Sequence, residues 1–258
     1  MLTVEPISAF SDNYIWLIRR DNKAWVVDPG DASPVIDRLE QLSIDLEGIL
    51  ITHHHFDHTG GIDGLRRQYP QLQLITPPSE NIPQEALHVR AGDEIQVLGT
   101  NFSVLAIPGH TLDHIAYFAA RDNSEPLLFC GDTLFAGGCG RVFEGTNPMM
   151  HQSLQLLAQL PPATQVFCAH EYTMANLNFA LAVEPDNQKL KQRIERDGLS
   201  REENRPTVPS SLALELETNP FLRCEEPQII SAMHARSTLV DTSAAAVFGA
   251  IRQWKNDF

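Results

Sequence analysis

The segment from Thr52 to Gly60 carries the densest set of metal-ligating side chains in the chain. It reads THHHFDHTG and follows the apolar segment GILI at residues 48–51. Imidazole and carboxylate groups bind zinc and other first-row divalent metals. Four such groups form an H-x-H-x-D-H pattern, namely His53, His55, Asp57 and His58. Their type and spacing favour a metal site over a structural role.

The backbone of this loop indicates how it could serve two metals. In an extended chain successive side chains point to opposite faces, so His53, His55 and Asp57 are predicted to share one face. His58 then lies where the glycines after it turn the chain, and one loop can offer two ligands to each of two ions. His54 falls outside the pattern and is expected beside the ligands or at the surface.

Three other places supply a further candidate ligand. In each, an apolar segment that we predict to be a strand ends in the ligand: VLAI before PGHT, LLFC before GDT, and VFCA before HE. These ligands are His110, Asp132 and His170. Strand ends are where α/β and sandwich folds gather their active-site residues. Alone, each would more often be an ordinary polar residue, but with the first cluster they favour a shared metal site.

In their order along the chain, the THxHxDHxG loop, the GHT, the GD and the late histidine make the chain resemble the metallo-β-lactamase superfamily. More narrowly, it resembles the hydroxyacylglutathione hydrolases, the glyoxalase II enzymes. The segments that carry the narrower resemblance are DNY at 12–14, GCGRVFEG at 138–145, HEYT at 170–173, RPTVP at 205–209 and TNPF at 218–221.

The resemblance implies two divalent metal ions. One would be held by His53, His55 and His110, the second by Asp57, His58 and His170, with Asp132 bridging both. Two close metals bind a water between them, lower its pKa to near neutrality and polarise a carbonyl. This is hydrolase chemistry by a metal-bridging hydroxide, with Asp57 and Asp132 as its carboxylates. Zinc is the expected metal, although the same donors accept iron and manganese.

A thioester suits such a site because its leaving group is a thiolate, whose conjugate acid has a pKa of about 8.5. An amide or β-lactam nitrogen would need protonation or metal stabilisation. The resemblance implies that the substrate is S-D-lactoylglutathione, split into glutathione and D-lactate in the second step of methylglyoxal detoxification. Glutathione carries two carboxylates, so an acidic protein needs a local cationic pocket for it.

The glutathione contacts that the resemblance implies are Arg141, Phe143, Tyr172, Arg252 and Lys255. Phe143 stands where some relatives carry a tyrosine, and Arg141 replaces a lysine often found there. These differences would alter affinity more than reaction type. Without the family, Arg252 and Lys255 fit better as an ordinary solvated helix face.

The chain has four cysteines, with no C-x-x-C pair and no disulfide-scaffold spacing, which favours a reducing cytoplasm. Cys130 and Cys168 lie in apolar segments and are expected in the core. Cys139 is the exposed thiol candidate, but it has no evident base beside it. A glycine-rich turn with a tolerated cysteine is favoured there over a nucleophile.

Composition excludes several classes of partner. The 258 residues are 43% hydrophobic, enough for one large core and a smaller appendage. The net charge is -14, with 9 Lys/Arg against 21 Asp/Glu in residues 1–173 and 10 against 12 in residues 174–258. A polyanion would meet an unfavourable field, so we expect no nucleic-acid partner. Leu2 to Arg20 has no positively charged lead into an apolar stretch, and we expect no secretion and no membrane partner.

The elements that must position these residues indicate an α+β fold. Strands are predicted at 2–7, 14–18, 25–28, 48–52, 72–75, 95–98, 102–107, 115–119, 127–130 and 166–169, with helices at 34–41, 61–69 and 148–159. Two sheets with helices outside fit this count, and the resemblance makes them the αββα metallo-β-lactamase sandwich. After Tyr172 the pattern changes to helices, predicted at 174–183, 187–198, 211–217 and 242–255. We therefore expect a catalytic domain at 1–173 and a smaller all-helical substrate-binding domain at 174–258.

The roles of two residues near the candidate ligands, Asp28 and His114, stay open. Asp28, at a strand end before Pro29-Gly30, could bond a ligating histidine or be only a turn residue. His114 is expected next to the ligands.

Other functions also stay open. A glutathione persulfide dioxygenase with a single iron would need only part of the ligand set, which is complete here. Another binuclear hydrolase of the same fold should lack Arg252 and Lys255, and a non-catalytic metal-binding module should lack ligands. The oligomeric state is open, with a monomer expected.

Overall fold

The computed structural model describes residues 2–83, 85–236, 239 and 241–258. The chain divides into two compact units. Unit 1 comprises Met1–Ala106 and Asp113–Gly131, and unit 2 comprises Ile107–Leu112 and Asp132–Phe258. This division does not follow the expected boundary near residue 173, which stays a prediction. Within the described residues, no helix combines the length and apolar character needed to cross a membrane.

The first sheet of unit 1 has six strands in the order β1-β2-β3-β4-β5-β6. Their bounds are Thr3–Ala9, Asn13–Arg20, Lys23–Val27, Asp45–Leu50, Gln73–Thr76 and Leu87–His88. Strands β1 to β3 pair antiparallel, whereas β3, β4, β5 and β6 pair parallel. Parallel neighbours need crossover connections, and helices provide them between β3 and β4 and between β4 and β5.

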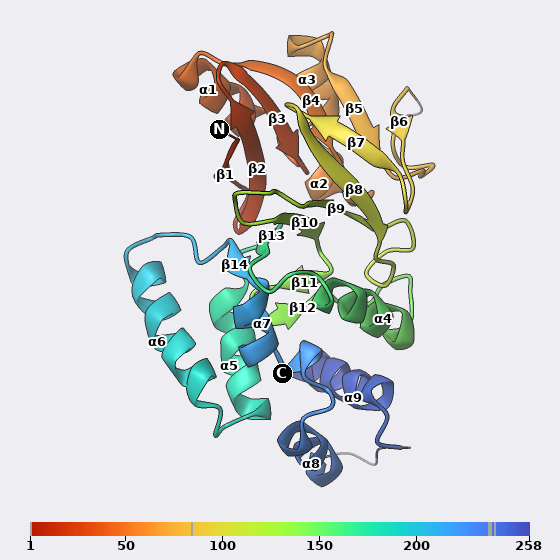
Figure 1. Cartoon of the computed structure of the whole chain (residues 1–258), viewed down its shortest axis with the longest axis vertical. Helices are drawn as coiled ribbons and strands as arrows, with labels where there is room; N and C mark the ends of the chain where they lie inside the picture. Colours follow the sequence, from red (N-terminus) through yellow and green to blue (C-terminus); the bar gives the residue numbers. More distant parts are fainter. Residues whose placement is uncertain (1, 84, 237–238, 240) are drawn as a thin grey trace. The chain divides into compact units, whose positions relative to one another are not determined.

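These crossovers contain α1 (Ser33–Leu42) and α3 (Ile62–Gln68), which Figure 1 shows beside the first sheet. Both helices bury one apolar face in the same core as the sheet. Val35 and Leu39 of α1 and Leu65 of α3 are at most 1% exposed there. The spacing of these residues follows one helical face, as the sequence indicated. The helices predicted at 34–41 and 61–69 are thus confirmed.

Unit 1 also contains four antiparallel strands in the order β10-β9-β8-β7. They span Leu127–Gly131, Ile115–Ala119, Thr100–Ala106 and Glu94–Val97. Tyr117 of β9 is buried, and its hydroxyl donates to the carbonyl of Ile51, directly after β4, at 2.8 Å. The end of β4, from which the histidine-rich segment continues, is therefore tied to the second group of strands.

Unit 2 is mainly helical. Its helices are α4 (Asn147–Ala158), α5 (Thr173–Val183), α6 (Gln188–Glu202), α7 (Leu212–Thr218), α8 (Pro227–Arg236) and α9 (Ala244–Asp257), with a 3-10 turn η1 at Pro220–Leu222. Polar side chains cap several N-termini: Asn187 accepts from the amide of Leu190, and Ser243 accepts from the amide of Ala246. Helix α9 packs on α4 and α8.

Short strands complete unit 2. β11 (Leu134–Phe135) pairs with β12 (Gly138–Cys139), and β13 (Gln165–Cys168) pairs with β14 (Ser210–Ser211). The expectation of an all-helical region after residue 173 is therefore wrong in one detail, since β14 lies in it. The two-residue strands and helix α8 were not predicted. Strands of two residues are too short to show an alternation of apolar and polar side chains.

Candidate functional site

The histidine-rich segment of unit 1 leaves the sheet before its ligands begin. Strand β4 ends at Leu50, and a one-turn helix, α2, spans Phe56–Thr59. The carbonyl of His55 accepts from the amides of His58 and Thr59, which closes this turn. The predicted extended backbone is therefore wrong from Phe56 onward. Asp57 and His58 lie on α2, and the turn brings them back towards the earlier histidines.

Three histidines of this segment face one another. The Nε2 atom of His53 lies 3.1 Å from Nδ1 of His55, and the ring centroids of His53 and His58 are 4.0 Å apart. Asp57 comes within 3.5 Å of His58 Nε2 through its Oδ2. Asn13 donates to the same carboxylate oxygen at 3.0 Å and so orients it. Unit 1 thus brings together His53, His55, Asp57 and His58.

Asp28 contacts two residues of this segment, Thr52 and His58. It follows β3 with a φ of 54°, and its side chain is 4% exposed. Its Oδ1 accepts from the amide of Thr52, and its Oδ2 accepts from the Thr52 hydroxyl, both at 2.7 Å. The same Oδ2 lies 3.0 Å from Nδ1 of His58. Asp28 is therefore both a turn residue and the partner of a candidate ligand.

These bonds decide which ring nitrogens carry a lone pair. The Thr52 hydroxyl gives its proton to Asp28, so it must accept from Nδ1–H of His53, 3.2 Å away. Nδ1 of His58 lies 3.0 Å from Oδ2 of Asp28, and this ion-pair contact favours a proton on that nitrogen. In both rings Nε2 is left as the acceptor, the nitrogen that can bind a metal. His114 stacks on His53 at 4.5 Å, next to the cluster as expected.

Unit 2 brings together the other three candidate ligands. Asp132 follows β10, and His170 follows β13, each at a predicted strand end. Oδ2 of Asp132 lies 3.3 Å from Nε2 of His110, and Oδ1 lies 3.4 Å from Nε2 of His170. All three side chains are buried. Each carboxylate oxygen of Asp132 therefore faces a different imidazole.

His110 is oriented by a backbone group. Its Nδ1 donates to the carbonyl of Arg141 at 2.7 Å, which leaves Nε2 as the acceptor beside Asp132. The amides of Phe143 and Glu144 in turn donate to the carbonyl of His110 at 3.3 Å each. Both units thus hold imidazoles whose free nitrogen is fixed and turned towards a carboxylate or another imidazole. Such donors suit a divalent metal.

Three of the predicted glutathione contacts lie near these ligands in unit 2. The ring of Tyr172 stacks on His170 with centroids 4.7 Å apart and planes 5° apart. Phe143 meets His110 edge-on at 5.2 Å. Both aromatic side chains are exposed, as is Arg141. They could therefore meet a ligand that reaches His110 or His170.

The remaining two contacts, on α9, do not form a solvated helix face. Arg252 is 5% exposed, and its Nη1 donates to the carbonyl of Cys139 at 3.0 Å. Lys255 donates to the carbonyl of Ala175 at 3.2 Å and lies 5.1 Å from the Phe179 ring. Burial, and then the charge of Arg252, lower the pKa of Lys255 from its usual 10.5.

Cys139 is buried, contrary to the expectation that its thiol is exposed. Burial raises the pKa of its thiol above the usual 9.0, although Arg252 opposes that shift. A protonated, enclosed thiol is a poor nucleophile. The favoured reading of this segment as a glycine-rich turn is therefore supported. Cys130 and Cys168 lie in the core, as predicted.

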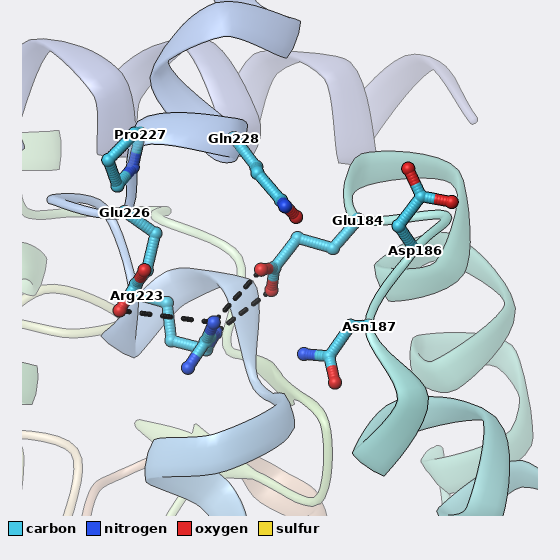
Figure 2. A pocket seen from close by; sticks show the side chains of 7 residues that line it. All are labelled: Glu184, Asp186, Asn187, Arg223, Glu226, Pro227 and Gln228. Carbon is cyan, nitrogen blue, oxygen red and sulfur yellow. Dashed lines mark hydrogen bonds and ion pairs between the residues drawn. The ribbon is translucent and has the colours of Figure 1, made fainter.

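The described residues also line a pocket apart from these clusters. It has a volume of about 420 Å³ and lies in unit 2 between α5, α6 and α8. Figure 2 shows Arg223 bonded to Glu184 and paired with Glu226 across it. None of the predicted site residues lines this pocket.

Sequence reasoning missed two residues that orient ligands, Asn13 and Thr52. Asn13 lies in the family-like DNY segment, and Thr52 directly precedes the first histidine, but neither has a spacing that indicates its contact. His54, which was expected beside the ligands or at the surface, is half-buried, and its Nδ1 lies 2.9 Å from Oδ2 of Asp113.

Comparison with known proteins adds independent findings. Residues 10–170 match the family described as the metallo-beta-lactamase superfamily, and residues 171–258 match the hydroxyacylglutathione hydrolase C-terminus. The chain is 51% identical over 260 residues to a hydroxyacylglutathione hydrolase from Chromohalobacter salexigens and 50% identical over 259 residues to one from Photobacterium profundum. Both matches cover 100% of each chain. Among solved structures, ETHE1 from Myxococcus xanthus is 25% identical with a TM-score of 0.62, covering 99% of both chains.

Proposed function

This chain belongs to the hydroxyacylglutathione hydrolases of the metallo-β-lactamase superfamily, and from this premise we propose that it hydrolyses S-D-lactoylglutathione to glutathione and D-lactate. It is a metal-dependent thioester hydrolase with an α+β fold. The reaction is that of the second step of methylglyoxal detoxification. A persulfide dioxygenase or another hydrolase of the same fold is not favoured, because the full-length relatives at about 50% identity are named for this reaction.

We propose that two divalent ions bind per chain, with zinc as the native metal. The first would be held by His53, His55 and His110, and the second by Asp57, His58 and His170, with Asp132 shared. When bound, such ions lower the pKa of water and polarise a carbonyl oxygen. Iron and manganese also suit these donors.

The observation that carries the proposal is the position of the Asp132 carboxylate. Its two oxygens point at Nε2 of two different histidines, at 3.3 and 3.4 Å. A carboxylate that pairs one ring would need only one such contact. Two contacts, with one of the rings already fixed through Nδ1, suit a carboxylate shared between two ions.

The residues of the chain would divide the remaining work. Asp28 and Thr52 hold His58 and His53 in one tautomer, and the Arg141 carbonyl does so for His110. Because the departing thiolate needs no general acid, no further titratable group has to reach the sulfur.

Glutathione would be recognised by cationic and aromatic groups in unit 2. We propose Arg141 and Lys255 as partners of its carboxylates, with Phe143 and Tyr172 packing along its backbone. The local cations would offset the acidic net charge of -14. We further propose the reducing cytoplasm, since the four cysteines form no C-x-x-C pair and have no disulfide-scaffold spacing. A monomer with no nucleic-acid or membrane partner completes the proposal.

The test uses Lys255→Met. We expect KM for S-D-lactoylglutathione to rise and kcat/KM to fall about tenfold or more, because a charge-assisted hydrogen bond is lost. A short uncharged thioester should be hydrolysed as by the wild type. Lys189→Met, on the exposed surface of α6, makes the same charge change and should leave kcat/KM unchanged for both substrates. Equal losses on both substrates with Lys255→Met would contradict glutathione recognition by this residue.

A further inference from the structure

The segment from Phe135 to Gly140 joins the candidate ligand Asp132 to Arg141, and side chains of unit 2 hold its backbone at every residue. The side chains that make these bonds lie on α5, α7 and α9 and at the residue that follows α7. Asn219 donates to the carbonyls of Phe135 and Gly138 at 3.2 and 2.8 Å, and Asn176 donates to the carbonyl of Ala136 at 3.2 Å. The carboxylate of Glu215 accepts from the amide of Gly137 at 2.8 Å. Arg252 donates to the carbonyls of Cys139 and Gly140 at 3.0 and 3.4 Å.

All four of these side chains are at most 5% exposed. A buried polar group that loses its partner is costly, so each bond disfavours displacement of the segment. Glu215 is itself held by the fully buried Arg193, whose Nη2 lies 2.6 Å from its Oε1. The segment is therefore fixed from one side by an interconnected polar network.

Of these four side chains, Arg252 bonds the end of the segment that lies next to Arg141. The Gly140 carbonyl that it binds belongs to the peptide that continues directly into Arg141. The Arg141 carbonyl accepts Nδ1–H of His110 at 2.7 Å. On its other side, Gly140 donates to Thr133, next to Asp132. A Cβ at Gly140 would lie 1.8 Å from the Asp132 carbonyl, so no other residue type fits this approach.

The guanidinium of Arg252 is already committed to this role. Its Nη1 contacts the carbonyls of Cys139 and Gly140, and its Nε donates to Asn256 at 3.2 Å. Its Cζ lies 5.1 Å from the centre of the Phe221 ring. Two of its three nitrogens are thus engaged by groups of unit 2.

We infer that Arg252 is a positioning residue for the metal site: by holding the Cys139 and Gly140 carbonyls, it fixes the Arg141 carbonyl that orients the imidazole of His110. This role rests on the proposed function only in taking His110 as a metal ligand. It differs from the direct glutathione contact that the resemblance implies. Arg252 acts on the chemistry of every thioester, whereas a glutathione contact acts on one class of substrate.

The test compares Arg252→Met, Arg252→Lys and Arg236→Met. Arg236 lies on α8 against Trp254, so its variant loses the same charge and a similar ring contact. The readouts are the affinity of metal-free protein for Co²⁺, the absorption spectrum of the Co²⁺ form, and kcat on a short uncharged thioester. Arg252→Met should weaken Co²⁺ binding about tenfold or more, change the spectrum and lower kcat. Arg252→Lys can still donate to one carbonyl and should recover part of each loss.

Wild-type Co²⁺ affinity and spectrum in Arg252→Met, with only KM for S-D-lactoylglutathione raised, would overturn the inference and favour a direct contact. Equal changes in Arg236→Met and Arg252→Met, or no recovery in a folded Arg252→Lys, would also overturn it. Failure of the proposed function looks different. In that case the wild type would bind Co²⁺ but would not hydrolyse S-D-lactoylglutathione, and the Co²⁺ comparison would still decide the role of Arg252.

Discussion

At the scale of residues, three candidate ligands are held through the ring nitrogen opposite to the one that would bind metal. A hydroxyl holds His53, a carboxylate holds His58 and a backbone carbonyl holds His110. Each partner favours a proton on Nδ1, so each leaves Nε2 with its lone pair. Three unrelated local structures therefore give the same imidazole tautomer. This agreement is what a metal site requires and what ordinary buried histidines do not need.

Asp28→Asn tests the support of His58. The new amide can still accept from the Thr52 amide, but its NH₂ group would then face the Thr52 hydroxyl, and the negative charge beside Nδ1 of His58 would be lost. We expect metal affinity to fall about 10- to 100-fold, measured by competition with a chelating dye. Asp31→Asn is the matched control, because Asp31 accepts from the amide of Ser33 and asparagine can do the same. Equal metal affinity in the two variants would contradict a supporting role for Asp28.

At the scale of elements, the strands that lead to the ligands could be predicted because their apolar runs end abruptly in His, Asp or Gly. Helix α2 could not, since four residues are too few to show a helical period. The burial of Arg252 was also beyond the sequence. Its acceptors lie 113 and 112 residues earlier in the chain, and a cationic residue on a helix is usually solvated. The cluster could thus be predicted from ligand type and spacing, whereas its supporting contacts required the fold.

The packing of α4 against α9 has a pH dependence of its own. His151 of α4 lies 5.6 Å from the Phe248 ring of α9, and burial lowers its pKa below the usual 6.5, with Glu225 opposing. As the pH falls below about 6.5, the unfolded chain takes up a proton at this residue before the folded chain does, so acid reduces stability. His151→Gln should lose less unfolding free energy than the wild type between about pH 7.5 and 5.5.

Chemical denaturation of metal-free protein at both pH values measures this difference. His234→Gln, at an exposed site on α8, controls for removal of a histidine as such. If His151→Gln loses as much stability on acidification as the wild type, burial of His151 makes no contribution to the acid sensitivity.

At the scale of the whole molecule, unit 2 contains two groups of residues that the expected boundary near 173 would separate. His110, Asp132 and His170 lie in it together with the cationic residues of α9. The family matches divide the chain between residues 170 and 171, close to that expected boundary. Contacts and sequence families therefore divide the chain differently. Three of the residues proposed for metal binding therefore share one compact unit with those proposed for glutathione recognition, so a change on α9 can reach these three ligands within unit 2.

Hydrolysis of the glutathione thioester should require two metal ions per chain. This requirement is tested by adding Zn²⁺ stepwise to metal-free protein and following thiol release from S-D-lactoylglutathione at each step. We expect no turnover without metal and a rise that reaches its plateau at two ions per chain, since Asp132 and both sets of ligands are needed together. Full turnover at one ion per chain, or turnover in the absence of metal, would contradict the account.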